Sequence, residues 1–527
     1  MRTFRSILLT VAVAGSPFAA SLAAAGPVTL PVQLDSAFKS AQSGRLLVFA
    51  TKVEPGAKPS DRIDASDWQP TATAIAAREV DALQPGATAT VDGEIDTFPA
   101  AFSSLAPGTY RFQAVLDRDH SYNYGGRGGG DIVSPVVEAA LPGPVPAMTL
   151  SSVLPERTFD TFLANSSADM AARLREGLAH VKPVDFVSPS LSVFWGRNVE
   201  MRGWVALPPG YRDGGPRFPT VYATGGYGSN LVSAESSAAM MADMMIKGEA
   251  PPMIWVYLDQ STATGTHEFA DSANNGPWGK ALTAELIPWL EHHYAMDAKP
   301  SSRFLTGHSS GGWATLWLQV RYPATFGGSW PTSPDPSDFH NFTNVDLYAA
   351  GANAYHDTKG EAVPLVRDHG KVLATLEQFA RKEAAIGAYG GQMSSFDWVF
   401  SPKGPDGRPL QMFDRTTGAV NPDVLGYWSE HYDIAHIVAR DWPKLKHDLD
   451  GKIHLHAGTS DTFYLDGSAH RLQAVFQSLG AHEDFTFVPD KTHFDLYTEG
   501  DDPRALLKTI AWDMYVRARP GAKRPAG

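Results

Sequence analysis

The pentapeptide GHSSG at residues 307–311 constrains the fold of this chain more than any other segment. Residues 303–306 (RFLT), just before it, are typical of a buried strand, and residues 312–320 (GWATLWLQV) carry large apolar side chains at helical spacing. The helical pattern ends before Pro323, as expected of a helix. A serine between such a strand and such a helix is typical of a nucleophile elbow, a strained turn that presents the hydroxyl of Ser309.

Strand and helix patterns alternate on both sides of this turn. Continuous apolar runs at residues 220–224 and 253–258 are typical of strands buried on both faces, and a helical stretch follows at residues 280–294. The alternation predicts an α/β domain with a doubly wound, mainly parallel sheet. We expect it to span residues 185–515, with residues 335–448 inserted as a helical cap, because that segment is too long for a simple connection.

Residues 26–140 show a different pattern. Strand-like runs alternate there with turns that contain proline and glycine, and these runs lie at residues 45–51, 87–91 and 109–116. Long helical patterns are scarce, so we expect a small all-β domain, an immunoglobulin-like sandwich. A proline-rich linker with a connecting helix is expected over residues 141–184, and a C-terminal tail over residues 516–527.

Residues 1–25 have the three-part layout of a secretory signal, with Arg2 and Arg5, an apolar stretch, and small residues that end at Ala25. No later stretch reaches about 18 uninterrupted apolar residues, so we expect no transmembrane segment. The sequence therefore predicts an exported protein, periplasmic or secreted. The chain has no cysteine, which excludes disulfides and a cysteine nucleophile.

The charge balance argues against a nucleic-acid partner. The 527 residues carry 44 Lys and Arg against 57 Asp and Glu, a formal net charge of −13, whereas a phosphate-binding surface needs clustered basic side chains. We interpret the acidity as an aid to solubility. The sequence does not define the oligomeric state.

A serine hydroxyl is a weak nucleophile at neutral pH, so Ser309 needs a histidine base that a carboxylate orients. In α/β-hydrolases the acid and then the histidine follow the serine, on loops after later strands. Asp461 follows the strand-like residues 452–458, and His493 follows the next such run, residues 485–488. We therefore expect Ser309, Asp461 and His493 to form a catalytic triad.

Other acids remain candidates for this role. Asp461 could instead be a turn aspartate that caps the next helix. Asp466 is then the first substitute, and Asp335 or Asp338 is the second. His308, next to the serine, has at most a supporting role.

An oxyanion forms when Ser309 attacks a carbonyl, and it needs two fixed backbone N–H donors. We expect one donor from Ser310 and the other from the glycine-bearing loop at residues 225–228, with Tyr227 preferred over Gly226. A plain glycine-rich turn is the alternative interpretation of that loop. Three aromatic residues lie close in sequence to these elements and are candidates for the substrate pocket: Trp278, Tyr464 and Phe494.

We expect neither a metal nor another cofactor. One acidic cluster adjoins a glycine-rich loop and consists of Asp117, Asp119, His120 and Asp131. It could hold a cation, but acids in surface turns are the better interpretation. His454 and His456 alternate on a strand, and no acid at suitable spacing completes a metal site around them.

These features together resemble the putative-esterase family of α/β-hydrolases, which includes enterochelin esterase and S-formylglutathione hydrolase. The resemblance rests on residues 207–211 (LPPGY), 282–294, 307–312 and 458–465 and on His493. It implies the α/β-hydrolase fold, and ester hydrolysis or acyl transfer by Ser309, Asp461 and His493. The loop at residues 224–228 departs from the family because it lacks the histidine that many members place before the glycines.

The leading hypothesis is an exported serine hydrolase that cleaves carboxylic esters through an acyl-enzyme. Acyl transfer, or cleavage of a peptide or lactone bond, would use the same triad, and a cap that excludes water keeps these alternatives open. A third hypothesis is a carbohydrate- or wall-binding protein with a catalytically dead hydrolase domain. The β domain suggests it, but the intact triad candidates oppose it.

Overall fold

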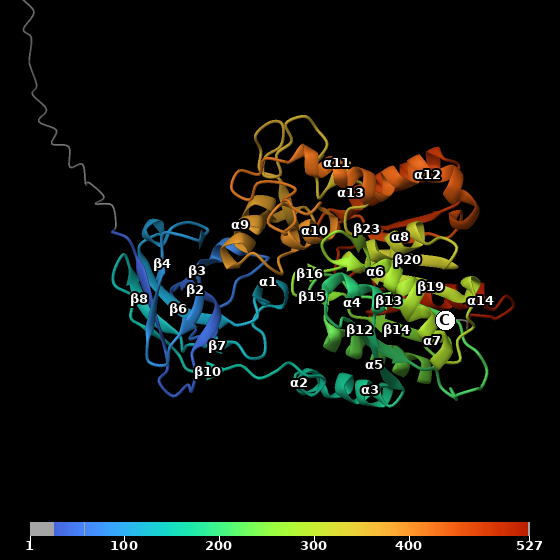
Figure 1. Cartoon of the computed structure of the whole chain (residues 1–527), viewed down its shortest axis with the longest axis horizontal. Helices are drawn as coiled ribbons and strands as arrows, with labels where there is room; N and C mark the ends of the chain where they lie inside the picture. The colour runs from blue at the N-terminus through green and yellow to red at the C-terminus, as the bar shows by residue number, and fades with distance from the viewer. Residues whose placement is uncertain (1–25, 57, 525–527) are drawn as a thin grey trace, which may run out of the picture.

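The computed structural model describes residues 26–56 and 58–524, so the predicted secretory signal at residues 1–25 lies outside the described residues. Three regions are visible in Figure 1: an all-β region at one end, an α/β region at the other, and an insertion with helices that lies above both. The proposed catalytic residues all come from the α/β region or from the loops that follow its strands.

One eight-stranded sheet forms the centre of the α/β region, in the order β11-β12-β14-β13-β19-β20-β23-β24. Its strands are β11 (Val181–Val187), β12 (Glu200–Ala206), β13 (Thr220–Thr224), β14 (Ile254–Leu258), β19 (Arg303–His308), β20 (Gly328–Thr332), β23 (His454–Gly458) and β24 (Asp484–Val488). β12 runs antiparallel to both of its neighbours, β11 and β14, whereas every pair from β14 to β24 is parallel. The predicted α/β class with a mainly parallel sheet is confirmed.

Helices cover both faces of this sheet, which explains why its central strands are apolar throughout. Along β13, Val221 packs toward α5 (Leu231–Ile246), whereas Tyr222 packs toward α7 (Ile287–His293) and α8 (Ser310–Arg321). Since successive side chains of a strand point to opposite faces, a strand with helices on both sides needs apolar residues at every position.

The helix expected over residues 280–294 is interrupted. It consists of α6 (Trp278–Ala281), a π-helical turn (Leu282–Leu286) and α7 (Ile287–His293). Pro288 has no N–H to donate to the carbonyl four residues earlier, and a widened turn accommodates that loss.

The all-β region contains two sheets that share one core. The smaller has the order β4-β1-β9, and the larger has the order β10-β7-β6-β2-β3-β5, with β8 paired to β6. The strands are β1 (Thr29–Leu34), β2 (Gln42–Lys52), β3 (Thr73–Leu83), β4 (Thr88–Asp92), β5 (Thr97–Phe98), β6 (Gly108–Asp117), β7 (Ile132–Val133), β8 (Val137–Leu141), β9 (Met148–Leu150) and β10 (Ser152–Val153). Val32, Phe112 and Met148 from both sheets meet in the core. The immunoglobulin-like topology stays a prediction.

The strands of this region continue past the expected boundary at residue 140. β9 pairs with β1, and β10 pairs with β7, so residues 142–147 connect two strands of the same region. The connecting helix is split into α2 (Phe159–Ala164) and α3 (Ala168–Leu178), where Ser167 caps the second helix.

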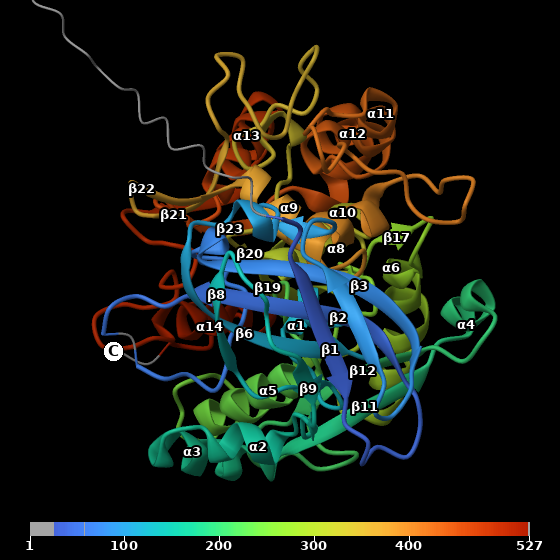
Figure 2. The ribbon, with the colours of Figure 1, turned by 90° about the vertical axis from the view of Figure 1, so that its left-hand side faces the viewer.

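The segment at residues 335–448, predicted to be an insertion, contains helices and a hairpin. Its elements are β21 (Pro364–Asp368), β22 (Lys371–Thr375), α9 (Leu376–Ile386), α10 (Gln392–Phe400), α11 (Pro422–His431) and α12 (Ile434–Leu449). Trp313 and Trp317 of α8 pack in one core with Phe396 and Trp428 of the insertion. Figure 2 shows α9 above the strands of the all-β region, and Ile386 packs there against Phe49.

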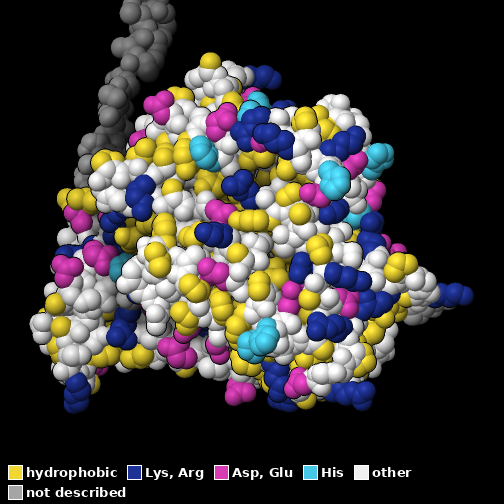
Figure 3. Space-filling view, turned by 45° about the vertical axis from the view of Figure 1, so that its right-hand side comes forward, with side chains coloured by type: hydrophobic (Ala, Val, Ile, Leu, Met, Phe, Trp, Pro, Cys, Tyr) yellow, Lys and Arg dark blue, Asp and Glu magenta, His cyan; other side chains and the backbone are white. Residues whose placement is uncertain are grey.

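Both signs of charge occur on the surface. On the face shown in Figure 3, Lys and Arg lie among Asp and Glu. A nucleic-acid-binding surface is expected to carry a continuous basic stripe instead, and this face has none. Within residues 26–56 and 58–524, no helix combines the length and the apolar composition that crossing a bilayer requires.

Candidate active site

Ser309 occupies a tight turn between β19 and α8. Its backbone has φ 59° and ψ −124°, a conformation that costs energy for any residue with a side chain. A Cβ on Gly307 would lie 2.2 Å from the carbonyl oxygen of Gly311, and one on Gly311 would lie 2.3 Å from that of Thr224. Both motif glycines are therefore required, and the turn has the geometry of a nucleophile elbow.

Asp461 and His493 form a buried pair on neighbouring loops. His493 Nδ1 lies 2.9 Å from Asp461 Oδ2, and both side chains are almost fully buried. The other carboxylate oxygen of Asp461 accepts the backbone N–H groups of Phe463 (2.9 Å) and Leu465 (3.3 Å). Burial alone would raise the pKa of Asp461, but His493 and the N–H donors outweigh it and hold that pKa below its ordinary value.

His493 contacts the ring of His308, the residue that precedes Ser309 in the elbow. The ring centroids of the two histidines are 4.3 Å apart, and His308 Nδ1 lies 3.0 Å from Thr332 Oγ1. Burial, reinforced by the nearby His493, lowers the pKa of His308 to about 3. His308 is therefore a neutral imidazole that packs against His493, which fits a supporting role.

The three substitute acids have other partners. Asp466 Oδ1 lies 3.0 Å from Arg367 Nη2, and Asp338 Oδ2 lies 2.9 Å from Arg471 Nε. Neither acid is hydrogen-bonded to His493. Of the candidate acids, Asp461 is thus the one that the structure hydrogen-bonds to His493.

Asp335 contacts the serine turn instead of the histidine. Its Oδ2 accepts from Ser310 Oγ at 2.6 Å, and its Oδ1 lies 3.5 Å from Ser309 Oγ; no hydrogen bond joins Ser309 Oγ to His493. Burial raises the pKa of Asp335 to about 6. This contact was not anticipated from the sequence, although the position of β20 beside β19 places the two following loops together.

The loop at residues 225–228 passes directly over the elbow. A Cβ on Gly226 would lie 2.9 Å from the Cβ of Ser309, so only glycine allows this approach. The backbone N–H of Tyr227 donates to no backbone carbonyl in the described part of the chain. Ser310 opens α8, where N–H groups lack intrahelical acceptors. Both expected oxyanion donors therefore belong to segments that adjoin Ser309.

The three aromatic pocket candidates lie in different surroundings. Phe494 is 62% exposed, and its ring centroid lies 5.3 Å from that of His493. The ring of Tyr464 lies under the guanidinium of Arg367, 4.1 Å away. Trp278 is buried and stacks on His267, with centroids 3.6 Å apart. Of the three, Phe494 is in ring contact with the proposed base.

The all-β region also reaches the candidate active site. Trp68, 42% exposed, has its ring centroid 5.3 Å from that of Phe494. A cavity of about 530 Å³ lies close by, and its lining includes Asp64, Tyr124, Tyr227, Gly228, Lys382 and Glu383. These residues come from the all-β region, the loop over the elbow, and α9. No local sequence pattern connects Trp68 with the site.

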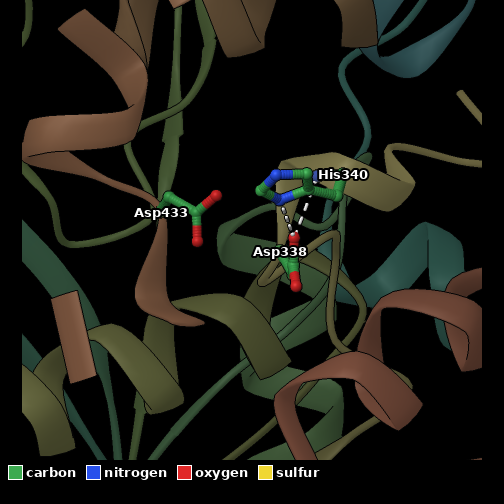
Figure 4. A group of neighbouring side chains, drawn as sticks. All are labelled: Asp338, His340 and Asp433. Atoms are coloured by element: carbon green, nitrogen blue, oxygen red, sulfur yellow. Dashed lines mark hydrogen bonds and ion pairs between the residues drawn. The ribbon is translucent and has the colours of Figure 1, made fainter. Parts of the chain in front are cut away.

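Among the residues that the structure describes, two side-chain clusters have the atoms to ligate a cation, and the carboxylates of both already accept hydrogen bonds from other groups. In Figure 4, His340 lies against Asp338, with Asp433 opposite. Asp338 also binds Arg471, and Asp433 accepts from the hydroxyl of Tyr348 at 2.8 Å. The second cluster consists of Asp117, Asp119 and Asp131. Its carboxylates accept backbone N–H groups of their own loop, whereas His120 pairs with Glu79.

Comparison with known proteins finds one matching family model and several similar solved structures. The model of a family described as "Putative esterase" matches residues 196–500, which include Ser309, Asp461 and His493. Among solved structures, a ferulic acid esterase is 14% identical, with 64% of this chain and 97% of that chain covered and a TM-score of 0.39. An S-formylglutathione hydrolase from Staphylococcus aureus is 12% identical, with 64% and 98% covered and a TM-score of 0.37. A ferulic acid esterase from Anaeromyces mucronatus is 14% identical, with 64% and 89% covered and a TM-score of 0.34. No curated protein matches the sequence.

Proposed function

This chain belongs to the putative-esterase family and is a carboxylic ester hydrolase, and from this premise we propose that it is an exported serine esterase that forms an acyl-enzyme at Ser309. The observation that carries the proposal is the buried Asp461–His493 pair beside a strained serine turn. Such a constellation is what a serine nucleophile needs. Export rests on the layout of residues 1–25 alone.

In the first half of the proposed reaction, His493 acts as the base. Its Nδ1–H donates a hydrogen bond to Asp461 and keeps its proton, which leaves the Nε2 lone pair to accept the Ser309 proton. The Ser309 hydroxyl turns from Asp335 toward the imidazole, and its oxygen bonds to the ester carbonyl carbon. Collapse of the tetrahedral intermediate breaks the bond to the alcohol, which leaves with the proton from Nε2.

In the second half, water replaces the alcohol. The oxygen of water adds to the acyl carbon while His493 Nε2 takes one proton from that water. The proton then passes from Nε2 to Ser309 Oγ as the carboxylic acid departs. Asp461 remains ionised throughout and stabilises the imidazolium. In both halves the negative charge on the carbonyl oxygen is stabilised by the N–H of Ser310 and by that of Tyr227 or Gly226.

A covalent fluorophosphonate probe tests the proposal directly. We expect one adduct per chain, on the tryptic peptide that contains Ser309, because only an activated serine attacks phosphorus at a useful rate. Intact-protein mass spectrometry followed by peptide mapping measures the stoichiometry and the position. Heat-denatured protein is the control and should not react. An adduct on a different serine would contradict the assignment.

Trp68 and Phe494 form one side of the proposed substrate entrance, since both are partly exposed and Phe494 contacts the base. We expect Trp68→Ala to raise KM for p-nitrophenyl butyrate about fivefold with kcat unchanged, because a lost aromatic contact costs about 1 kcal/mol. Steady-state kinetics measures both constants.

Trp195→Ala is the matched control, since Trp195 in α4 (Pro189–Trp195) is 38% exposed but has no ring contact with the site residues. It should leave KM unchanged. A fall in kcat in the Trp68 variant, or equal effects in both variants, would refute a role in substrate binding.

A further inference from the structure

The loop over the elbow is held from outside the α/β region. The hydroxyl of Tyr124, in α1 (Tyr122–Gly125) of the all-β region, donates to the carbonyl oxygen of Ser229 at 2.6 Å. The hydroxyl of Tyr227 donates to the carbonyl oxygen of Asn123 at 2.8 Å and also contacts that of Gly390 in the insertion. The two tyrosine rings meet edge to face, 5.0 Å apart.

Two hydrogen bonds from the α/β region reach this loop: the Ser229 N–H donates to the carbonyl oxygen of Gly226 at 3.1 Å, and Gln260 Nε2 donates to that of Gly225. Of residues 225–228, only Tyr227 has a side chain, because the other three are glycines. Glycine loses more conformational freedom on ordering than any other residue. On one side β13 ends at Thr224, and on the other Asn230 caps α5. The bonds made by Tyr124 and Asn123 therefore add to the few that order the residues between these points.

Asn123 joins α1 to the insertion as well. Its Nδ2 donates to the carbonyl oxygens of Glu383 (3.1 Å) and Gly387 (2.9 Å) at the end of α9. Arg45 of β2 donates to the carbonyl oxygen of Ile386 at 2.9 Å. The all-β region, the insertion and the loop thus meet in one hydrogen-bonded junction.

Both tyrosine hydroxyls are suited to a permanent bond. Burial raises the pKa of Tyr227 and that of Tyr124 well above the ordinary value of a phenol, so both are neutral donors at neutral pH. Removal of either hydroxyl would leave a backbone carbonyl without this donor.

We propose that the all-β region is a positioning element for the oxyanion hole, in which Asn123 and Tyr124 hold the loop at residues 225–228 in place over Ser309. The inference rests on the proposed function, because the oxyanion donors are part of it. Tyr124 acts through the loop and touches no reacting atom, so it is a positioning residue. A shift of about 1 Å in a catalytic group can cost up to about 100-fold in rate.

Tyr124→Phe tests the proposal. We expect kcat for p-nitrophenyl acetate to fall about tenfold and KM to change less than about twofold, because the loop aligns the transition state rather than the ground state. The inhibition constant of an alkyl boronic acid, which forms a tetrahedral adduct with the serine, should rise by a similar factor. Tyr110→Phe is the matched control, since the Tyr110 hydroxyl also donates to a backbone carbonyl of the all-β region, that of Ala106, at 2.8 Å. It should change neither constant.

Each outcome is decisive. Unchanged kcat and boronic-acid affinity in the folded Tyr124 variant would overturn the proposal, as would an equal loss in the Tyr110 variant. If Tyr124→Phe does not fold, Asn123→Ala takes its place. This variant removes the bonds to Glu383 and Gly387, and we expect the same fall in kcat.

Fluorophosphonate labelling of Ser309 in the wild-type protein separates the positioning proposal from the proposed function on which it rests. If labelling succeeds while both variants keep full kcat, only the positioning role is wrong; if labelling maps elsewhere, the proposed function itself fails.

Discussion

Replacement of Ser309 by alanine is expected to lower kcat for p-nitrophenyl acetate by about 10⁴-fold or more, since loss of a triad nucleophile has effects of this size. Without Oγ no acyl-enzyme forms, and only the activity contributed by binding and the oxyanion donors remains. The variant should fold normally, because alanine keeps the same Cβ in the turn at φ 59°. Initial rates at saturating ester, together with the thermal midpoint, measure both effects.

Ser310→Ala is the matched control for this experiment. It removes the neighbouring hydroxyl, which donates to Asp335 at 2.6 Å, but it keeps the backbone N–H proposed as an oxyanion donor. We expect kcat to change by about tenfold at most, the scale of one ordinary intramolecular hydrogen bond. Full activity in Ser309→Ala would show that the nucleophile lies elsewhere, and equal losses in the two variants would point to disruption of the turn.

The strands that carry the site were predictable from local sequence. The run at residues 253–258 corresponds closely to β14 (Ile254–Leu258), and the run at residues 220–224 to β13. Strands buried on both faces must be apolar at every position, so their sequences stand out without knowledge of the fold. The elbow was predictable for a related reason, because its close backbone contacts require glycines at fixed spacing.

The choice between candidate acids depended on strand order, which local patterns do not contain. β23 pairs with β24, so Asp461 after the first meets His493 after the second. β20 pairs with β19, so Asp335 lies beside Ser309. The sequence supplied the residue types, and the sheet decided which ones meet.

Contacts between the all-β region and the α/β region could not be predicted from local sequence patterns. The ring contact of Trp68 with Phe494 and the bond from Tyr124 to Ser229 join segments that are far apart in the chain. The strands β9 and β10 have three and two residues, too few to show a pattern. The proline-rich segment before them, residues 142–147, therefore has the pattern of a linker between domains, although the chain then returns to the same two sheets.

Asp461→Asn is expected to lower kcat by about 10⁴-fold, the effect known for removal of the triad carboxylate charge. The asparagine Oδ1 can still accept the N–H groups of Phe463 and Leu465, so the loop keeps its shape. The amide NH₂ then faces His493 Nδ1 and donates to it, which moves the imidazole proton to Nε2. In that tautomer Nε2 cannot accept the Ser309 proton, and the cost appears in kcat rather than KM.

Asp466→Asn is the control, because Asp466 lies in the same loop but pairs with Arg367 at 3.0 Å. A partly exposed ion pair contributes at most about 1 kcal/mol to folding, so kcat should stay within about twofold. Steady-state kinetics of both variants decides the assignment, since a larger loss in the Asp466 variant would transfer the role to that acid. Against the opposing effect of burial, the pKa of Asp461 is held below its ordinary value chiefly by His493, so the wild-type carboxylate is ionised at neutral pH. Any loss of wild-type activity between about pH 5 and 7 therefore reports another group, because the charge on Asp461 does not change in that range.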